Sequence, residues 1–260
     1  MRQLISEILR LAEMEIPKYR DKLIELARDI DEYKKEAVER PRYVDTPDYI
    51  AIDSGYAVIQ YRYLNIAIIV VVIIDKYINS ETILFSFKRN EDIDLNSYIR
   101  KQELARAEKH SGYVLSDGPL SPYMKEPRGF IIGVSKDPVA PRYWKGIGGR
   151  VGEWLREISG YVSELYGAEL LLRGEPPGSM LKPVKLGKYL VTYIKGDSVF
   201  YVEFPEYIPK DVVASFFRYG YPIKLRIAHR YAKITREYLR TVRTIAPRLL
   251  DISTKYREYL

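Results

Sequence analysis

The chain has 260 residues, of which 47% are hydrophobic and 30% are charged. This composition is typical of a globular protein and excludes a disordered one. Cysteine is absent from the sequence, which excludes disulfides, thiolate metal sites and cysteine nucleophiles.

The formal net charge of +7 suits a polyanionic partner, because each phosphate contact releases a condensed counterion. A generally basic soluble protein explains the same charge equally well. The longest apolar run, Ile66 to Ile74, has nine residues, whereas a membrane-spanning helix needs about 20. The sequence after Met1 lacks the pattern of a signal peptide. We therefore expect a cytoplasmic protein that does not bind a membrane.

Residues 1–40 are predicted to form a long helical arm. Their apolar side chains recur at helical spacing, and the opposite face is dense in charged residues. A break or kink is expected at Pro17. We expect this arm to serve in packing or dimerisation rather than in catalysis.

Residues 45–260 are predicted to form the core, and the whole chain, residues 1–260, to form a single α/β domain with a mixed sheet flanked by helices. Short runs rich in Val, Ile and Tyr predict a three-stranded meander over residues 49–53, 57–63 and 66–74. The elements expected after it are strand 82–87, helix 95–110 with Asp94 as its N-cap, strands 113–116 and 130–134, helix 151–166, a hairpin of 190–193 and 199–204, helix 211–217 and a long basic helix 223–249.

Three acidic residues occupy positions from which they can converge. Asp53 ends the first predicted strand, Glu103 lies on the helix that follows the meander, and Asp117 ends the next strand. A carboxylate cluster repels itself unless cations neutralise it, and carboxylate oxygens suit Mg²⁺ or Mn²⁺. Two such ions activate a water and stabilise the leaving oxygen in phosphodiester hydrolysis. The order strand-Asp, hairpin, helix-Glu, strand-Asp is that of ribonuclease-H-like nucleases.

Each of these residues also has a purely structural explanation. Asp53-Ser54-Gly55 and Asp117-Gly118-Pro119 are ordinary turn sequences. Glu103 is also explained as an exposed residue on the surface of its helix. Glu108, five residues later, is an alternative candidate for the ligand. The order of the motifs therefore carries more weight than any one of them.

The segment from Gly220 to Ile234 makes the pattern more specific. It holds Gly220-Tyr221-Pro222 and then His229, one of only two histidines in the chain, and a neutral imidazole can bind Mn²⁺. This segment resembles the C-terminal signature of the NurA family of archaeal nucleases, in which Gly-Tyr-Pro leads into a helix with an Ala-His pair. Asp117-Gly118-Pro119-Leu120 resembles the second acidic motif of that family, and Asp53 resembles its first. The resemblance spans residues 45–235.

The resemblance implies a ribonuclease-H-like fold and a manganese-dependent nuclease, with magnesium as the alternative ion. It implies 5′ to 3′ exonuclease action and endonuclease action on single-stranded DNA. It also implies a homodimer that works with a HerA-type hexameric ATPase in DNA-end resection and recombination repair. By resemblance, the metal ligands are Asp53, Glu103, Asp117 and His229, while Tyr221 assists near the metal and Lys136 neutralises phosphate charge.

The sequence departs from the family in two respects. The chain is short for the family, and its first motif reads Asp-Ser-Gly where family members often read Asp-Gly-Ser. These departures motivate an alternative, a catalytically inactive DNA-binding or adaptor subunit of the same fold. A third hypothesis is another ribonuclease-H-like enzyme, such as a ribonuclease or a transposase-type strand transferase.

Two basic regions are candidates for DNA contact. A glycine-rich loop around Lys145 and Arg150 opens a predicted helix, where backbone amides can hold a phosphate. The predicted C-terminal helix carries Arg226, Arg230 and Lys233, with tyrosines among its basic residues. A flexible loop and a solvated helix face explain the two regions without any ligand.

Overall fold

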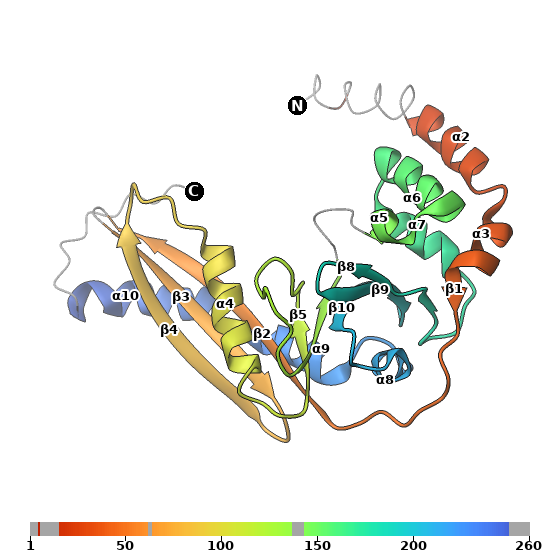
Figure 1. Ribbon diagram of the computed structural model, residues 1–260. Coiled ribbons are helices and arrows are strands. Elements are labelled where there is room, and N and C mark those ends of the chain that lie inside the picture. The colour runs from red at the N-terminus through yellow and green to blue at the C-terminus, as the bar shows by residue number, and fades with distance from the viewer. Residues whose placement is uncertain (1–4, 6–15, 62–63, 137–142, 250–260) are drawn as a thin grey trace. The chain divides into compact units, whose positions relative to one another are not determined.

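The computed structural model describes residues 5, 16–61, 64–136 and 143–249. The chain divides into two compact units. The first unit comprises residues 1–46 and 135–220, and the second unit comprises residues 47–134 and 221–260 (Figure 1). Each unit is therefore built from two separate stretches of sequence.

The second unit is organised around a mixed sheet. Its strands are β2 (Tyr49–Gln60), β3 (Leu64–Ile74), β4 (Ile78–Lys88), β5 (Tyr113–Asp117) and β6 (Phe130–Ser135). They lie in the order β4-β3-β2-β5-β6. β3 is antiparallel to β2 and β4, whereas β5 is parallel to β2 and β6. Most residues of β3 are buried, which explains its continuous run of apolar residues.

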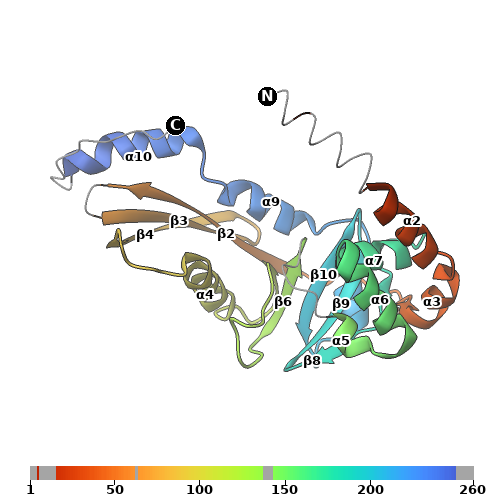
Figure 2. The ribbon, with the colours of Figure 1, turned by 90° about the horizontal axis from the view of Figure 1, so that it is seen from above.

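Helices cover both faces of this sheet. α4 (Leu95–Ala107) packs on β2 and β5, and the side chain of Asp94 caps it by accepting a hydrogen bond from the backbone N–H of Ser97. α9 (Ile223–Ala232) lies on the opposite face against β2 and β3 (Figure 2). α10 (Arg236–Leu249) follows α9, and its Leu239 and Val242 pack on the apolar cluster at the far end of β2 and β3.

Gly55 sets the distance between α9 and the sheet. A Cβ atom at this position would lie 2.1 Å from the carbonyl oxygen of Ala232, at the end of α9. That separation is far inside van der Waals contact, and the atom in the way belongs to the backbone. Only glycine therefore allows α9 to pack this closely on β2.

The first unit contains a second group of strands, β1 (Val38–Glu39), β7 (Met180–Leu181), β8 (Val184–Leu186), β9 (Tyr189–Lys195) and β10 (Val199–Pro205). They lie in the order β1-β7-β9-β10, and β8 pairs with β9. The helices of this unit are α2 (Ile16–Leu26), α3 (Ile30–Ala37), α5 (Tyr143–Ile147), α6 (Gly149–Tyr161), α7 (Glu164–Leu171) and α8 (Lys210–Ser215). The helices and strands of this unit share one hydrophobic core, which includes Trp154 and Tyr193.

The described part of the predicted arm packs against its own unit. The indole N–H of Trp154 on α6 donates to the carbonyl of Leu26 at 2.7 Å, and the rings of Tyr33 and Trp154 stack with centroids 5.3 Å apart. Pro17 lies in α2, and the residues just before α2 lie outside the described residues, so the expected break at Pro17 stays a prediction. An interruption that was not predicted falls at residues 27–29, between α2 and α3. Residues 1–4 and 6–15 of the arm lie outside the described residues.

Four other predicted elements are corrected by the structure. The strands expected at 49–53 and 57–63 form one continuous strand, β2, which ends at Gln60, so that Asp53 lies inside a strand rather than at its end. Residues 62 and 63 lie outside the described residues. The helix expected at 151–166 is two helices, with Ser163 capping the second through a hydrogen bond from the N–H of Tyr166. The long basic helix is interrupted at residues 233–235.

The remaining elements are confirmed with small shifts at their ends. They are the strands at 66–74, 82–87, 113–116 and 130–134, the helix at 95–110, the hairpin of 190–193 and 199–204, and the helix at 211–217. Within the described part of the chain, every helix is too short or too polar to span a membrane.

We predict that Gly55→Ala lowers the free energy of unfolding by at least about 2 kcal/mol, because α9 must move away from β2 to admit the methyl group. The matched control is Gly160→Ala near the end of α6, where a new Cβ meets no atom within 4 Å. That substitution should leave stability unchanged or raise it by about 0.5 kcal/mol. Urea unfolding of both variants measures the difference, and equal stabilities would contradict the proposed packing constraint.

Candidate metal centre

Strand pairing brings two aspartates to the same face of the sheet. β2 and β5 are parallel, and Ile52 pairs with Ser116. Asp53 and Asp117 are the next residues on the two strands, so their side chains leave the same face. This is the face that α9 covers.

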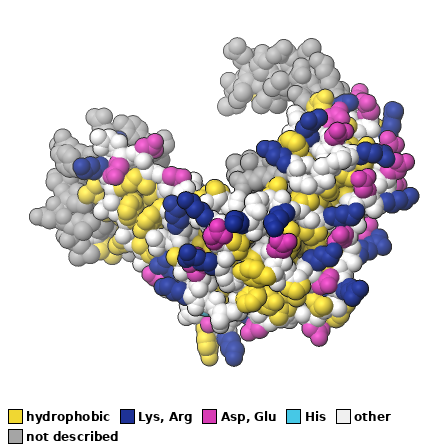
Figure 3. All heavy atoms as spheres, in the orientation of Figure 1, with side chains coloured by type: hydrophobic (Ala, Val, Ile, Leu, Met, Phe, Trp, Pro, Cys, Tyr) yellow, Lys and Arg dark blue, Asp and Glu magenta, His cyan; other side chains and the backbone are white. Residues whose placement is uncertain are grey.

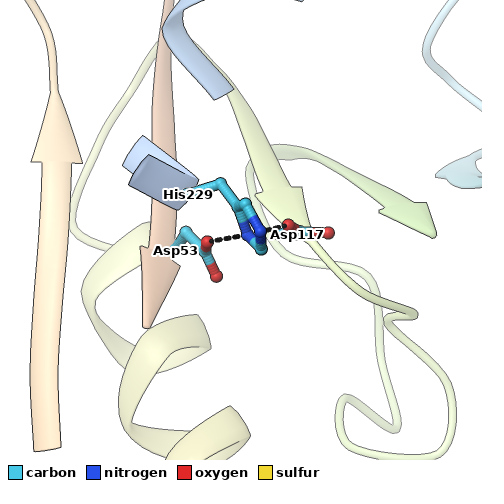
Figure 4. Close-up of side chains that lie close together, drawn as sticks. All are labelled: Asp53, Asp117 and His229. Carbon is cyan, nitrogen blue, oxygen red and sulfur yellow. Dashed lines mark hydrogen bonds and ion pairs between the residues drawn. The ribbon is translucent and has the colours of Figure 1, made fainter. Parts of the chain in front are cut away.

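His229 on α9 completes the cluster (Figure 4). Its Nδ1 atom lies 2.9 Å from Oδ2 of Asp53 and 3.2 Å from Oδ2 of Asp117. Lys224 fixes the beginning of the same helix to the beginning of β2. Its ammonium group donates to the carbonyl of Tyr49 at 2.5 Å and to Oδ1 of Asp48 at 2.9 Å. The imidazole therefore approaches the two carboxylates from a helix that is held at its start.

These three side chains fit a divalent cation. One ligand atom from each lies within 4.8 Å of the other two. Neighbouring ligands of an octahedral ion with bonds of about 2.1 Å lie about 3.0 Å apart, close to the two distances from Nδ1. Two carboxylates with one imidazole suit Mn²⁺ better than Mg²⁺, which prefers an all-oxygen shell.

The electrostatics of Asp53 also favour a cation. Burial, the negative charge of Asp117 and the negative charge of Glu103 together raise the pKa of Asp53 to about 8. The N–H of Ser54, which donates to Oδ1 of Asp53 at 2.7 Å, opposes this shift only in part. A bound cation would stabilise the ionised form that this surrounding disfavours.

Glu103 lies beside this cluster but is held by the chain itself. Its carboxylate accepts hydrogen bonds from the hydroxyls of Ser116 at 2.5 Å and Ser54 at 2.8 Å, and it forms an ion pair with Arg100. Burial raises the pKa of Glu103, and the Arg100 guanidinium opposes that shift. Because Ser54 follows Asp53 in the strand, these serines and Glu103 lie on the α4 face. The metal-ligand role of Glu103 stays a prediction.

The competing residue, Glu108, has a different environment. It is an exposed residue at the end of α4, and its carboxylate lies 3.3 Å from the guanidinium of Arg128. Of the two glutamates, Glu103 is therefore the one that is buried against β2 and β5 and that raises the pKa of Asp53.

Arg100 is the buried residue that sequence reasoning missed. It donates to the carbonyls of Asp117 at 2.7 Å, Gly118 at 2.7 Å and Pro119 at 3.0 Å, and thereby holds the turn in which β5 ends. Gly118 has φ of 111°, a conformation that favours glycine. The available signal was the spacing of Arg100 and Glu103, which places an opposite charge one turn away on the same helix.

The remaining predicted site residues lie in varied environments. Tyr221 is buried directly before α9, and Lys136 is an exposed residue directly after β6. The ammonium group of Lys145 lies 5.6 Å from the centroid of the Trp144 ring. Arg150 forms an ion pair with Glu32 at 2.9 Å. The predicted contacts of these four residues with substrate stay predictions.

The three predicted DNA-binding residues of the C-terminal region are Arg226, Arg230 and Lys233. They are exposed and lie on α9 or directly after it. On the face shown in Figure 3, Lys and Arg side chains are interspersed with Asp and Glu over much of the surface. The net charge is therefore not gathered into one patch on that face.

The chain is similar in fold to solved structures, but its sequence matches no known family model. No protein-family model matches the sequence, and no curated protein matches it. Among solved structures, the NurA nuclease from Sulfolobus solfataricus matches 99% of this chain and 100% of its own length, with a TM-score of 0.63 and 13% identity. A structure of NurA bound to dAMP and manganese matches 99% of this chain and 98% of its own length, with a TM-score of 0.56 and 12% identity.

The chain has a NurA-like fold. A third structure, NurA with manganese, agrees with a TM-score of 0.53 and 11% identity, and it covers 96% of this chain and 98% of its own length. At these identities the likeness to NurA shows the fold alone.

We predict that without divalent cations the free energy of unfolding falls as pH rises through the window from about 4 to about 8. The folded state keeps a proton on Asp53 up to a pKa of about 8, whereas the unfolded chain releases it near the ordinary value of 3.8. The loss is up to about 1.4 kcal/mol per pH unit. Mn²⁺ should therefore raise the melting temperature more at pH 8.5 than at pH 6.

Differential scanning calorimetry with EDTA or Mn²⁺ at the two pH values measures this effect. Asp53→Asn serves as the control, because it removes the titrating carboxyl and should flatten the pH dependence while abolishing most of the Mn²⁺ response. A wild-type response to Mn²⁺ that does not change with pH would show that Asp53 does not ionise on metal binding.

We predict that Arg100→Lys weakens Mn²⁺ binding about 10-fold and destabilises the protein by about 2 kcal/mol. Lysine keeps the charge but cannot reach three carbonyls and Glu103 at once, so the turn that carries Asp117 loses its support. Arg106→Lys on the same helix is the matched control, because its partner Glu81 is exposed. Calorimetric titration measures the affinity, and equal affinities in the two variants would exclude this supporting role.

Proposed function

We propose that this chain is a metal-dependent nuclease that hydrolyses phosphodiester bonds in DNA. The observation that carries the proposal is the convergence of Asp53, Asp117 and His229, from two strands and a helix, within 4.8 Å of one another. The NurA-like fold supports it, since one solved structure with this fold is described as the NurA nuclease from Sulfolobus solfataricus. The buried position of Asp53 supports a cation, because an unneutralised carboxylate there is costly.

Each residue has a proposed role at this centre. Asp53, Asp117 and His229 hold the cation, and Arg100 positions Asp117 through its hold on the following turn. A divalent cation bound here would lower the pKa of a water molecule and stabilise the charge that develops on the phosphate. Tyr221 orients the phosphate or the attacking water, and Lys136 neutralises phosphate charge, as the family resemblance suggests.

We propose the ribonuclease-H-like class for the second unit. Support comes from its strand arrangement, in which three antiparallel strands are followed by two that run parallel to the first. Support for manganese comes from the donor set and from the solved NurA structures that contain this metal.

The finer activity is proposed from the family resemblance. It comprises 5′ to 3′ exonuclease action, endonuclease action on single strands, and cooperation with a HerA-type ATPase in DNA-end resection and recombination repair. The same resemblance supports a homodimer. The cytoplasmic location is proposed from the sequence pattern near Met1 and the short apolar runs. The full-length match to NurA structures supports this extension at the level of the fold.

A second candidate is an inactive DNA-binding or adaptor subunit. The observation that favours it is the engagement of Glu103, both of whose oxygens accept hydrogen bonds from the chain's own side chains. If this engagement persists with metal present, the centre has three protein ligands rather than four. Such a subunit would bind DNA or a HerA-type partner without turnover.

We predict that the purified protein degrades single-stranded DNA with Mn²⁺, and that Asp117→Asn or His229→Ala lowers the rate at least about 100-fold. Each variant loses one of the three groups that hold the cation. Glu108→Gln is the matched control, since it neutralises an exposed carboxylate nearby in the chain and should retain full activity. Gel analysis of labelled DNA measures the rates, and thermal unfolding confirms that the variants fold.

The outcomes separate the two candidates. Cleavage that survives in both ligand variants would remove the proposed centre. A well-folded wild-type protein that binds Mn²⁺ and DNA but never cleaves would favour the inactive subunit. An RNA substrate of the same sequence tests the third hypothesis, because a ribonuclease would prefer it.

A further inference from the structure

A basic pattern repeats along the two helices that cover the α9 face of the sheet. Arg226, Arg230 and Lys233 follow the spacing i, i+4, i+7, and the same spacing recurs ten residues later in Arg236, Arg240 and Arg243. All six side chains are exposed. Between residues 223 and 245, Glu237 is the only acidic residue.

The first three cations lie on the flank of α9 that carries His229. Leu225, Ala228 and Ala232 are buried and mark the side of the helix that faces the sheet. Successive residues of a helix are rotated by about 100° about its axis. Measured from His229, Lys233 is rotated by about 40°, Arg226 by about 60° and Arg230 by about 100°. All three rotations have the same sense and lead away from the buried side. The imidazole and these cations therefore share one flank.

On α10, the other three cations also lie on one flank beside the side chains that pack on the sheet. Leu239 and Val242 pack on the sheet, and Arg243, Arg236 and Arg240 lie about 40°, 60° and 100° beyond Leu239 in the same rotational sense. Glu237, about 160° beyond Leu239 in the same sense, lies beside Arg240 at the outer edge of this set. Because α9 and α10 follow one another along the same face in both views (Figures 1 and 2), the two sets of cations form one basic flank.

We propose that this basic flank, formed by Arg226, Arg230, Lys233, Arg236, Arg240 and Arg243, binds the phosphate backbone of single-stranded DNA next to the metal centre. The helical stretches from Arg226 to Ala232 and from Arg236 to Arg243 together rise about 20 Å at 1.5 Å per residue, and the non-helical residues 233–235 lie between them. This length spans about six phosphates at the 3.4 Å spacing of a stacked strand. The placement of the scissile phosphate rests on the proposed function, whereas the binding itself does not depend on cleavage.

The chemistry of the flank favours nucleic acid over other anionic partners. Its charges have one sign and continue from His229, the residue that approaches the candidate cation. An amphipathic membrane-binding surface needs apolar side chains beside its cations, and between Arg226 and Arg243 this flank exposes none. Tyr231 and Tyr238 are exposed but lie on the other flank, so the proposed contact is to phosphates and not to stacked bases.

The test compares two double variants with equal loss of charge. Arg236→Gln with Arg240→Gln removes two cations from the flank far from the metal centre. Lys101→Gln with Lys109→Gln is the control, because these exposed lysines belong to α4 and the turn after it, on the opposite face of the sheet. Both are made in an Asp117→Asn background and assayed in EDTA, so that DNA remains intact.

Fluorescence anisotropy with a labelled strand of about 20 nucleotides measures Kd across a range of salt concentrations. The flank variant should raise Kd about 10- to 30-fold near 0.1 M salt and lower the slope of log Kd against log salt by about 1.4, or about 0.7 per lost contact. The control variant should change neither.

Equal effects of the flank and control variants would overturn the proposal, because they would show a general response to net charge. Wild-type protein that binds phosphatidylserine vesicles but not the DNA strand would also overturn it. The same flank substitutions in the otherwise unmodified protein should raise KM for long strands and leave kcat unchanged. If binding behaves as expected but the unmodified protein never cleaves DNA, the proposed function fails while the basic flank stands.

Discussion

The repulsion between two neighbouring carboxylates is the constraint on which the candidate centre depends. Parallel pairing of β2 with β5 fixes Asp53 and Asp117 on one face of the sheet, whether or not their charges are balanced. His229 lies within 3.2 Å of both, and a divalent cation bound among the three side chains would neutralise the carboxylates. The other features of the second unit bring α9 and the turn after β5 to the positions that this arrangement requires.

Successive side chains along β2 point to opposite faces of the sheet and have different partners there. Asp53 and Gly55 face α9, where one carries charge and the other permits close packing. Ser54, between them, faces α4 and donates to Glu103. The order Asp-Ser-Gly thus places the Ser54 hydroxyl on the α4 face and the glycine without a side chain on the α9 face. Exchanging the last two residues would remove the hydroxyl from Glu103 and place a side chain against α9.

Much of this centre could be predicted from the sequence, because its residues carry local signals. Asp117 precedes a Gly-Pro turn, and His229 follows Gly-Tyr-Pro in a helical pattern. The extent of β2 was not predictable in the same way. Asp-Ser-Gly has turn propensity, but pairing with β3 keeps it extended. Arg100 escaped notice because its burial depends on three carbonyls distant in the chain.

The discontinuity of the second unit has a consequence during synthesis of the protein. Asp53 and His229 are separated by 176 positions, and the stretch between them includes most of the first unit. A growing chain that has reached only Gly220 already contains both aspartates and their strands but not the imidazole or α9. A nascent chain therefore lacks a complete set of ligands, and the centre can form only after translation has passed His229.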